Sequence, residues 1–247
     1  MKFEVRVFPG KTAAGEAGAA AAADIIRETL SRKGHMAIVF ASAVSQDAFL
    51  DALRTTQGID WPKITAFHMD EYAGMSAEHP ASFRRFLRER LFDQVPVAAF
   101  HELNGEAADP DAECARYSAL LAEAKPDLAI MGIGENGHVA FIDPPVCDFS
   151  ERRLARPVEL DDVCRMQQVH DGAFATLADV PKKALSLTTK LFLSIPHALV
   201  FVSGDHKAAA VRATIEGPIT EDCPASVLRR HNDATLFLDG AAAALVG

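Results

Sequence analysis

The sequence predicts an α/β protein built on a doubly wound, mostly parallel sheet with helices on both faces. Short apolar runs alternate with longer amphipathic or alanine-rich stretches along the 247 residues, which is the order of elements in such a sheet. The run at 127–133 is apolar after its first residue, as strands buried on both faces of a parallel sheet are. No low-complexity linker or internal repeat divides the chain, so we expect one domain over residues 1–247.

The individual elements follow from local patterns. The first half of the chain supplies strands over 3–8, 36–42 and 64–70, and helices near 11–32, from Ser45 onward and over 82–92. We expect Gly34 to end the first helix and the Ser45 hydroxyl to cap the second. The second half supplies helices over 111–124 and from about 206 to 216, and strands over 127–133, 184–189, 197–204 and 234–240. The segment 144–183 has little clean periodicity, and we interpret it as an inserted lid or subdomain.

The composition excludes several classes of partner. The formal net charge is −9 at pH 7, whereas nucleic acid and anionic membranes both require a basic face. Four scattered cysteines without a CxxC pair predict reduced thiols rather than a metal site or disulfides. The chain shows no basic-then-apolar leader and no run long enough to span a bilayer, so we expect a cytoplasmic protein. The oligomeric state, a homo-oligomer included, is left open.

The functional site is expected at one edge of the sheet. In open α/β sheets, ligands bind beyond the carboxyl ends of the strands, near the point where the strand order reverses. This rule selects the loops after residues 42, 70, 133 and 204. Two of these loops concentrate side chains that can do acid–base chemistry.

A glycine-rich turn follows the strand at 127–133. Gly132, Gly134 and Gly137 match the GxGxxG pattern of dinucleotide-binding proteins, but that pattern requires a helix that opens at the last glycine. Pro144 and Pro145 stop any helix soon after the turn, because proline lacks the amide donor and clashes with the preceding turn. We therefore expect no nucleotide cofactor here.

His138 follows the same turn, with acidic residues on either side. Glu135 and Asp143 could orient the imidazole and raise its basicity. The alternative is a histidine that only binds a carbonyl group in a tight turn. The position at the carboxyl end of a buried strand favours the catalytic interpretation.

Asp70 and Glu71 end the strand at 64–70, between aromatic neighbours. A carboxyl group in a partly desolvated pocket has a raised pKa and suits a general base. A helix cap or a solvated loop acid explains either residue equally well when it is considered alone.

Four segments combine these features in one order: FHMDEYAGMSAEHPASFRRFLRERLF at 67–92, MGIGENGHVAFIDPP at 131–145, VPKKALSLT at 180–188 and GDHKAAAVRATIEGPI at 204–219. Together they resemble the glucosamine-6-phosphate deaminase family, which shares a Rossmann-like superfamily with the 6-phosphogluconolactonases. The resemblance covers most of the chain after residue 60. The HVAF sequence after the glycine-rich turn is similar to the deaminase branch, since lactonases more usually continue Ser-Leu-Phe-Pro there.

The resemblance implies a reaction without metal or nucleotide cofactor on a small sugar phosphate. Asp70 matches the family aspartate that moves a proton between C2 and C1, and His138 matches the histidine that assists ring opening. Lys207 matches the lysine that pairs with the phosphate; a solvated surface lysine is the alternative. The implied substrate is glucosamine 6-phosphate or an epimer such as galactosamine 6-phosphate, with ammonia leaving from C2.

Three features depart from the family pattern. Asn136 stands where the family usually has aspartate, and the shorter Asp143 stands where it has glutamate. An amide hydrogen-bonds but takes up no proton, so a relay at that position would lose a carboxylate. The segment 40–46 replaces the family's phosphate loop, which is rich in glycine and threonine.

The remaining candidates divide into catalytic and binding residues. Besides Asp70 and His138, the catalytic candidates are Asp143, Asn136 and, as a substitute base, Glu71. The binding candidates are Ser42, Ser45, Gln46, Gly137, Arg165 and Lys207. Arg165 belongs to a polar cluster with Gln167 and Gln168 that we expect to close over the substrate; a lid held by surface polar contacts is the alternative. The arginines of 82–92 are expected to form a solvated face.

Two rival functions remain open. One is hydrolysis of 6-phosphogluconolactone, in which His138 would activate water. The other is a non-catalytic sugar-phosphate sensor that kept the fold while Asn136 and the altered loop weakened turnover.

Overall fold

A seven-stranded parallel sheet forms the centre of the computed structural model, which describes all residues from 1 to 247. In spatial order its strands are β1 (Lys2–Phe8), β10 (Asp233–Asp239), β9 (His197–Val202), β6 (Leu128–Met131), β2 (Met36–Phe40), β3 (Ile64–His68) and β5 (Ala99–His101). From the adjacent pair β2 and β6, the chain adds β3 and β5 on one side and β9 and β10 on the other. The predicted doubly wound sheet is confirmed.

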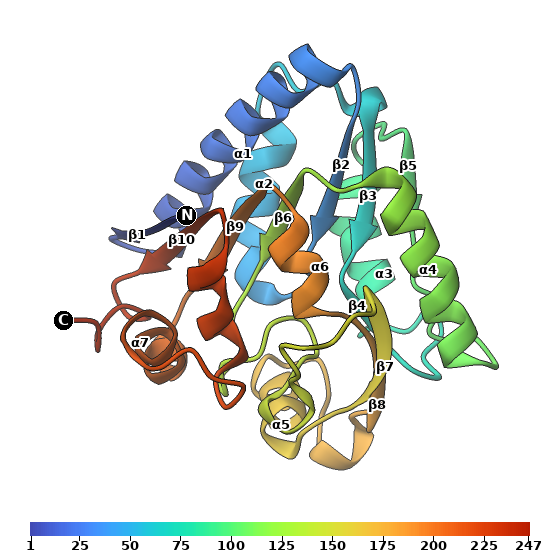
Figure 1. Cartoon of the computed structure of the whole chain (residues 1–247), viewed down its shortest axis with the longest axis vertical. Coiled ribbons are helices and arrows are strands. Elements are labelled where there is room, and N and C mark those ends of the chain that lie inside the picture. The colour runs from blue at the N-terminus through green and yellow to red at the C-terminus, as the bar shows by residue number, and fades with distance from the viewer.

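Helices cover both faces of this sheet (Figure 1). One face carries α1 (Lys11–Lys33), α2 (Asp47–Thr55) and α3 (Phe83–Leu87); the other carries α4 (Pro110–Ala124), α6 (Thr189–Ser194) and α7 (Ala208–Glu216). Side chains of β2 alternate between the two cores: Met36, Ile38 and Phe40 join the first, whereas Ala37 and Val39 join the second. Each fully buried Ile or Phe side chain contributes roughly 1.5–3 kcal/mol through the hydrophobic effect.

A small antiparallel sheet lies beside the main one and corrects two predicted strands. It contains β4 (Asp70–Tyr72), β8 (Lys183–Leu187) and β7 (Ala155–Glu159), in that order. The predicted strand 64–70 therefore breaks at Met69, and the predicted strand 184–189 pairs outside the main sheet. A distant side chain binds the chain where β3 ends: the Tyr117 hydroxyl accepts from the His68 amide at 3.0 Å and donates to the His68 carbonyl at 2.8 Å. A side chain thus takes the place of a strand partner where β3 ends.

The segment 144–183 packs on the small sheet. It contains β7, α5 (Asp162–His170) and part of β8. A separate apolar cluster holds it there, with members that include Tyr72, Phe141, Val158 and Cys164. In Figure 1, α5 lies beyond the lower ends of the central strands, which are their carboxyl ends.

The predicted cap at Ser45 was wrong, whereas the predicted helix over 82–92 is confirmed without the expected solvated face at Arg84. The Ser45 side chain makes no cap bond; residues Val44–Gln46 form a short 3-10 turn, and α2 begins at Asp47. The predicted helix 82–92 changes at Arg88 from α3 into one π-helical turn, Arg88–Phe92. Its arginines also differ from one another, because Arg84 is buried whereas its neighbours along the helix are partly exposed.

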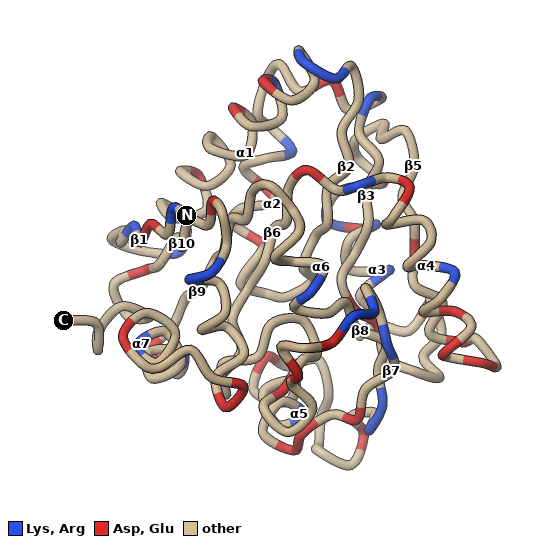
Figure 2. The backbone as a smooth tube through the Cα atoms, viewed as in Figure 1, with Lys and Arg blue, Asp and Glu red and all other residues tan.

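Charged residues of both signs are spread along the chain. Figure 2 shows Lys and Arg interspersed with Asp and Glu along the whole backbone. None of the helices has the length and hydropathy required to cross a bilayer. All four cysteines are free thiols.

Candidate active site

One cavity of about 450 Å³ opens at the carboxyl ends of the central strands. All four loops selected by the strand-end rule contribute to its lining. Five of the candidate residues meet there: Ser42, Ser45, Asp70, His138 and Lys207. The end of α5 adds Gln167 and Gln168, and Asp171 follows directly after that helix.

Asp70 is held by the first residue pair of the small sheet, in which it stands opposite Ser186 of β8. The residue is only 6% exposed, and its Oδ1 has no hydrogen-bond partner in the protein. Burial, and to a smaller degree the Glu71 carboxylate, raises the pKa of Asp70 well above its usual range. A desolvated, unpartnered carboxyl group at a cavity wall is suited to exchange a proton with a bound ligand.

His138 is fixed through its Nδ1 atom. Nδ1 lies 3.1 Å from Oδ1 of Asp143 and 2.8 Å from Oδ1 of Asn136. Both partners are acceptors, so Nδ1 carries a proton and Nε2 is the ring nitrogen left for a ligand. Burial alone would raise the pKa of Asp143, but the hydrogen bonds from His138 and Asn136 outweigh it and lower that pKa. Asp143 is thus the carboxylate that orients the imidazole.

Asn136 connects the imidazole to the beginning of α5. Its Nδ2 donates to Asp143 Oδ1 at 3.0 Å and to Asp161 Oδ2 at 3.3 Å, while the Asp161 amide donates to Asp143 Oδ2 at 3.1 Å. Glu135 does not join this network, because its carboxylate faces His170 at 3.2 Å. The predicted relay therefore runs through Asp143 alone, with Asn136 beside it.

Two glycines give the turn its shape. A Cβ at Gly134 would lie only 2.1–2.3 Å from three atoms of the His138 ring, so the imidazole packs directly on the backbone there. Gly137 has a φ of +82°, a left-handed conformation that favours glycine, and a Cβ there would lie 2.9 Å from Cys223 Sγ. Gly137 does not line the cavity. It shapes the turn, and its contact with the ligand stays a prediction.

Lys207 contributes a cation to the cavity lining, and Ser42 contributes a hydroxyl group. Lys207 is 6% exposed, and burial lowers the pKa of its ammonium group although the Asp171 and Glu135 carboxylates act in the opposite direction. It is therefore not a solvated surface lysine. The buried Ser42 Oγ has no hydrogen-bond partner in the protein. A buried cation and an unpartnered hydroxyl on one cavity suit an anionic ligand group.

Glu71 does not line the cavity and has a structural role instead. Its fully buried carboxylate accepts from Arg84 Nε at 3.0 Å and from the Ser82 hydroxyl at 2.8 Å. The Arg84 amide donates to the same carboxylate at 3.1 Å. A carboxylate satisfied in this way anchors the chain after β4, so Glu71 is a poor substitute base for Asp70.

Arg165 and Gln46 also lie away from the cavity lining. Arg165 is buried, and its guanidinium donates to the carbonyls of Leu177 at 2.7 Å and Val180 at 3.0 Å. It holds the segment 144–183 together, so the expected contact with phosphate or sugar is corrected. Gln46 is fully buried and donates to the Met131 carbonyl at 3.2 Å, which ties the loop after β2 to the end of β6.

One cluster brings three possible metal ligands together. The ligand atoms of His138, Asp143 and Cys164 lie within 4.8 Å of one another. Burial first, and the nearby Asp143 carboxylate second, raises the pKa of the Cys164 thiol well above its usual range. A metal would have to displace the thiol proton and the Nδ1 hydrogen bond that orients His138.

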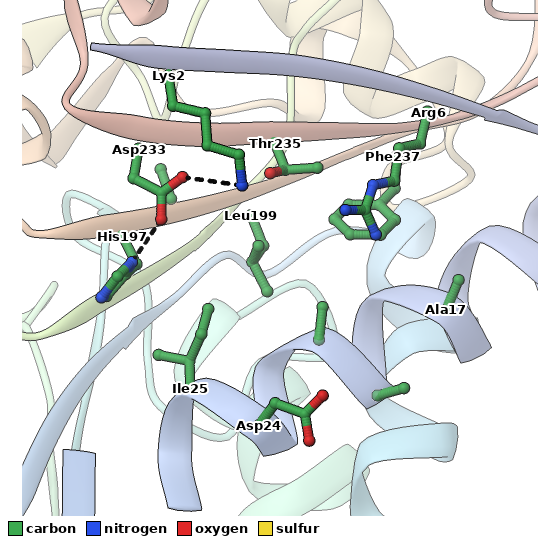
Figure 3. A pocket seen from close by; sticks show the side chains of 13 residues that line it. Lys2, Arg6, Ala17, Asp24, Ile25, His197, Leu199, Asp233, Thr235 and Phe237 are labelled. Carbon is green, nitrogen blue, oxygen red and sulfur yellow. Dashed lines mark hydrogen bonds and ion pairs between the residues drawn. The ribbon is translucent and has the colours of Figure 1, made fainter. Parts of the chain in front are cut away.

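A second cavity, of about 380 Å³, lies between α1 and the edge of the main sheet (Figure 3). Three of its polar groups satisfy each other: Asp233 pairs with Lys2 at 3.6 Å and with His197 Nδ1 at 2.7 Å. Arg6 lies over the Phe237 ring, 5.8 Å from its centroid. None of the candidate residues lines this cavity, so the chemistry belongs to the first one.

Similarity to known proteins agrees with the geometry. A sequence profile of the family described as glucosamine-6-phosphate isomerases/6-phosphogluconolactonase matches residues 9–237. The chain belongs to this family. The resemblance inferred from the four motif segments is thus confirmed.

Several relatives within the family are close enough to compare over nearly the whole chain. A glucosamine-6-phosphate deaminase of an Exiguobacterium species is 35% identical over 219 residues, covering 89% of this chain and 84% of the relative. One from Listeria monocytogenes is 34% identical over 230 residues, covering 93% and 96%. The solved structure of a monomeric glucosamine-6-phosphate deaminase superposes with a TM-score of 0.89 at 32% identity, covering 98% of this chain and 99% of that one. A 6-phosphogluconolactonase from Thermotoga maritima, 18% identical with a TM-score of 0.79, covers 96% of this chain and all of its own and shares the fold.

Proposed function

We propose that the protein converts an amino-sugar phosphate, glucosamine 6-phosphate or its epimer galactosamine 6-phosphate, into a ketose phosphate and ammonia. The observation that carries this proposal is the meeting of Asp70, His138 and Lys207 in one cavity. A desolvated carboxyl group, an oriented imidazole and a buried ammonium group are the three functions such a reaction requires. The similarity to curated deaminases supports the same conclusion.

Binding begins at the phosphate. Lys207 gains a counter-charge, and the Ser42 hydroxyl gains a hydrogen-bond partner, when a phosphate group enters their part of the cavity. The Ser42 hydroxyl has no hydrogen-bond partner in the protein, and the Asp171 and Glu135 carboxylates only partly offset the desolvation of Lys207, so a bound anion stabilises both groups. The bound phosphate thereby fixes the position of the sugar carbons relative to Asp70.

Ring opening is assigned to His138. With Nδ1 bound to Asp143 and Asn136, Nε2 takes the proton of the C1 hydroxyl and returns it to the ring oxygen as the C1–O5 bond breaks. The product is the open-chain aldehyde, whose carbonyl group acidifies the proton on C2. The Asp143 carboxylate stabilises the imidazolium that forms between the two transfers.

Proton transfer is assigned to Asp70. In its ionised form Asp70 removes the proton from C2 and returns it to C1, while a proton of the C2 amino group passes to O1. The aldehyde thereby becomes a hydroxymethyl group and the amine becomes an imine at C2. Water then adds to C2 and ammonia leaves, giving the ketose phosphate. A raised carboxyl pKa suits this role, because a base is most effective when its pKa lies near the working pH.

We also propose that the segment 144–183 acts as a lid over the cavity. It contributes Gln167, Gln168 and Asp171 to the lining, and Arg165 fastens its loop to α5 from within. Such a segment excludes water from the intermediates of ring opening and proton transfer.

The test is a panel of hexosamine phosphates, assayed for ammonia and for ketose phosphate. We expect both products from at least one member, and exchange of the C2 proton in deuterated water that Asp70→Asn abolishes while sugar-phosphate binding persists. Absence of both products from every member, with folded protein, refutes the proposal.

The rival functions give different outcomes in the same experiment. Acid release from 6-phosphogluconolactone without ammonia formation would indicate a lactonase. Sugar-phosphate binding without C2 proton exchange would indicate a sensor. Either result replaces the deaminase assignment.

A further inference from the structure

The last turn of α5 and the residue after it line the cavity that also contains Asp70 and Lys207. Gln168 and Asp171 are three residues apart, so they lie on one face of the helix end, and both line the cavity. Gln168 is bonded to Tyr72, two residues beyond Asp70. The negative charge of the Asp171 carboxylate raises the pKa of the Lys207 ammonium group, against the larger effect of burial. This helix end therefore extends from the proton-transfer carboxyl group toward the phosphate lysine.

Gln168 presents a fixed pair of donors. The Tyr72 hydroxyl donates to Gln168 Oε1 at 2.9 Å, and both residues are more than nine-tenths buried. The pKa of the Tyr72 phenol is raised well above its usual range, first by burial and then by nearby acidic groups, so the phenol keeps its proton. Because that proton bonds to the amide oxygen, the Gln168 amide nitrogen is turned away from Tyr72 and is left to donate to a ligand.

Asp171 presents a fixed acceptor. Gln167 accepts from the Glu135 amide at 2.9 Å and donates to Asp171 Oδ2 at 3.3 Å. Both ends of the Gln167 amide are thus occupied within the protein, and its function is to position Asp171. The other carboxylate oxygen of Asp171 remains available to a hydroxyl group.

We infer that Gln168 and Asp171 determine specificity by reading the C3 and C4 hydroxyl groups of the sugar. This inference rests on the proposed function, in which C1 and C2 lie at Asp70 and the C6 phosphate lies at Lys207. The carbons between those ends then face the last turn of α5. A donor amide and an acceptor carboxylate together match a hydroxyl group, which both accepts and donates. The orientation of the C4 hydroxyl is the only difference between glucosamine and galactosamine 6-phosphates, so these two residues set the preference between the epimers.

The test measures kcat/KM for both epimers in the wild type and in variants of this helix end. Gln168→Leu removes the amide donors at similar size, and Gln168→Glu replaces them by a carboxylate oxygen. Asp171→Asn replaces one carboxylate oxygen by an amide donor. We expect each variant to change the ratio of the two kcat/KM values by about tenfold or more, since a site built to bind a hydroxyl group discriminates strongly by that contact. Tyr72→Phe frees the Gln168 amide to turn, and should move the ratio in the same direction as Gln168→Leu by a smaller factor.

Met166→Ala is the matched control, because Met166 lies on the same helix, is 37% exposed and does not line the cavity. It should leave the ratio unchanged. A ratio within twofold of the wild type in Gln168→Leu, Gln168→Glu and Asp171→Asn overturns the inference, even if both activities fall. Wild-type protein inactive on every hexosamine phosphate refutes the proposed function instead. Thermal unfolding of each variant separates a loss of specificity from a loss of fold.

Discussion

Replacing Gly134 by alanine tests whether the position of the His138 ring matters to the chemistry. The φ of Gly134 is not in the left-handed region, so alanine fits the backbone, but the new Cβ would lie 2.1 Å from the nearest ring atom. Ordinary contact begins at 3.4 Å, so the imidazole must move by about 1.3 Å. The substitution changes no group that ionises or binds.

The magnitude follows from what the ring loses on moving. A shift of this size breaks or weakens the two Nδ1 contacts, at 2.8 Å to Asn136 and 3.1 Å to Asp143. A hydrogen bond to a charged group contributes about 1.5–3 kcal/mol, and a displacement of about 1 Å in an active site reduces the rate by roughly 10²-fold. We therefore expect kcat/KM for ammonia release to fall by about 10²-fold, or about 2.7 kcal/mol of transition-state stabilisation.

Gly132→Ala is the comparison within the same turn. Its Cβ would lie 3.4 Å from Gln46 Nε2, an ordinary contact, so we expect a loss of only a few-fold. The measurements are ammonia release under steady-state conditions and thermal unfolding of both variants. A folded Gly134→Ala variant that retains kcat/KM within threefold of the wild type would show that catalysis does not depend on the ring position described above.

Three further predictions concern buried charges. Because burial raises the pKa of Asp70, the folded protein holds a proton that the unfolded chain releases, so the stability contributed by this group falls as pH rises above the ordinary carboxyl pKa. Asp70→Asn should therefore unfold at a higher temperature than the wild type near neutral pH and at the same temperature below the ordinary carboxyl pKa; equal values at both pH contradict this. Glu71→Gln removes the buried counter-charge of Arg84 and leaves it only the half-exposed Glu106 at 3.7 Å. It should lower the free energy of unfolding by about 3–5 kcal/mol in denaturant titrations, whereas a change below about 1 kcal/mol would contradict a structural role. Lys207→Met should raise KM for the sugar phosphate by roughly tenfold to a hundredfold and also raise the melting temperature, because it removes a buried ammonium group; an unchanged KM would place the phosphate elsewhere.

The central sheet could be predicted because its strands carry their own signal. The run at 127–133 is apolar throughout the part that becomes β6, and the strand-end rule then placed Ser42, Asp70, His138 and Lys207 at one edge. No knowledge of the pairing partners was required, because the carboxyl ends of parallel strands meet in any strand order.

What could not be predicted depends on contacts between distant residues. Nothing local shows that β3 ends at a hydroxyl from Tyr117, or that β8 pairs with β4 rather than with the main sheet. The same limitation affects the charged residues. Glu71 stands next to Asp70 in the sequence and alternates to the other side of β4, where Arg84 satisfies it, and Arg165 turns toward carbonyl groups of its own segment. The direction of a polar side chain is decided by its partner, and composition alone does not name the partner.

The departure at Asn136 is consistent with its surroundings. Its side chain accepts from His138 Nδ1 at 2.8 Å while donating to Asp143 at 3.0 Å and to Asp161 at 3.3 Å. An aspartate in the same place would face two carboxylates at hydrogen-bond distance, and one of the three groups would have to take up a proton. An amide is the group of this size that accepts from the imidazole and donates to both acids at once. Asp161 caps α5, so the same amide that supports His138 also fixes the helix whose other end carries Gln168. The change from the family pattern therefore couples the orientation of the imidazole to the placement of the segment 144–183, and leaves Asp143 as the single carboxylate that orients the ring.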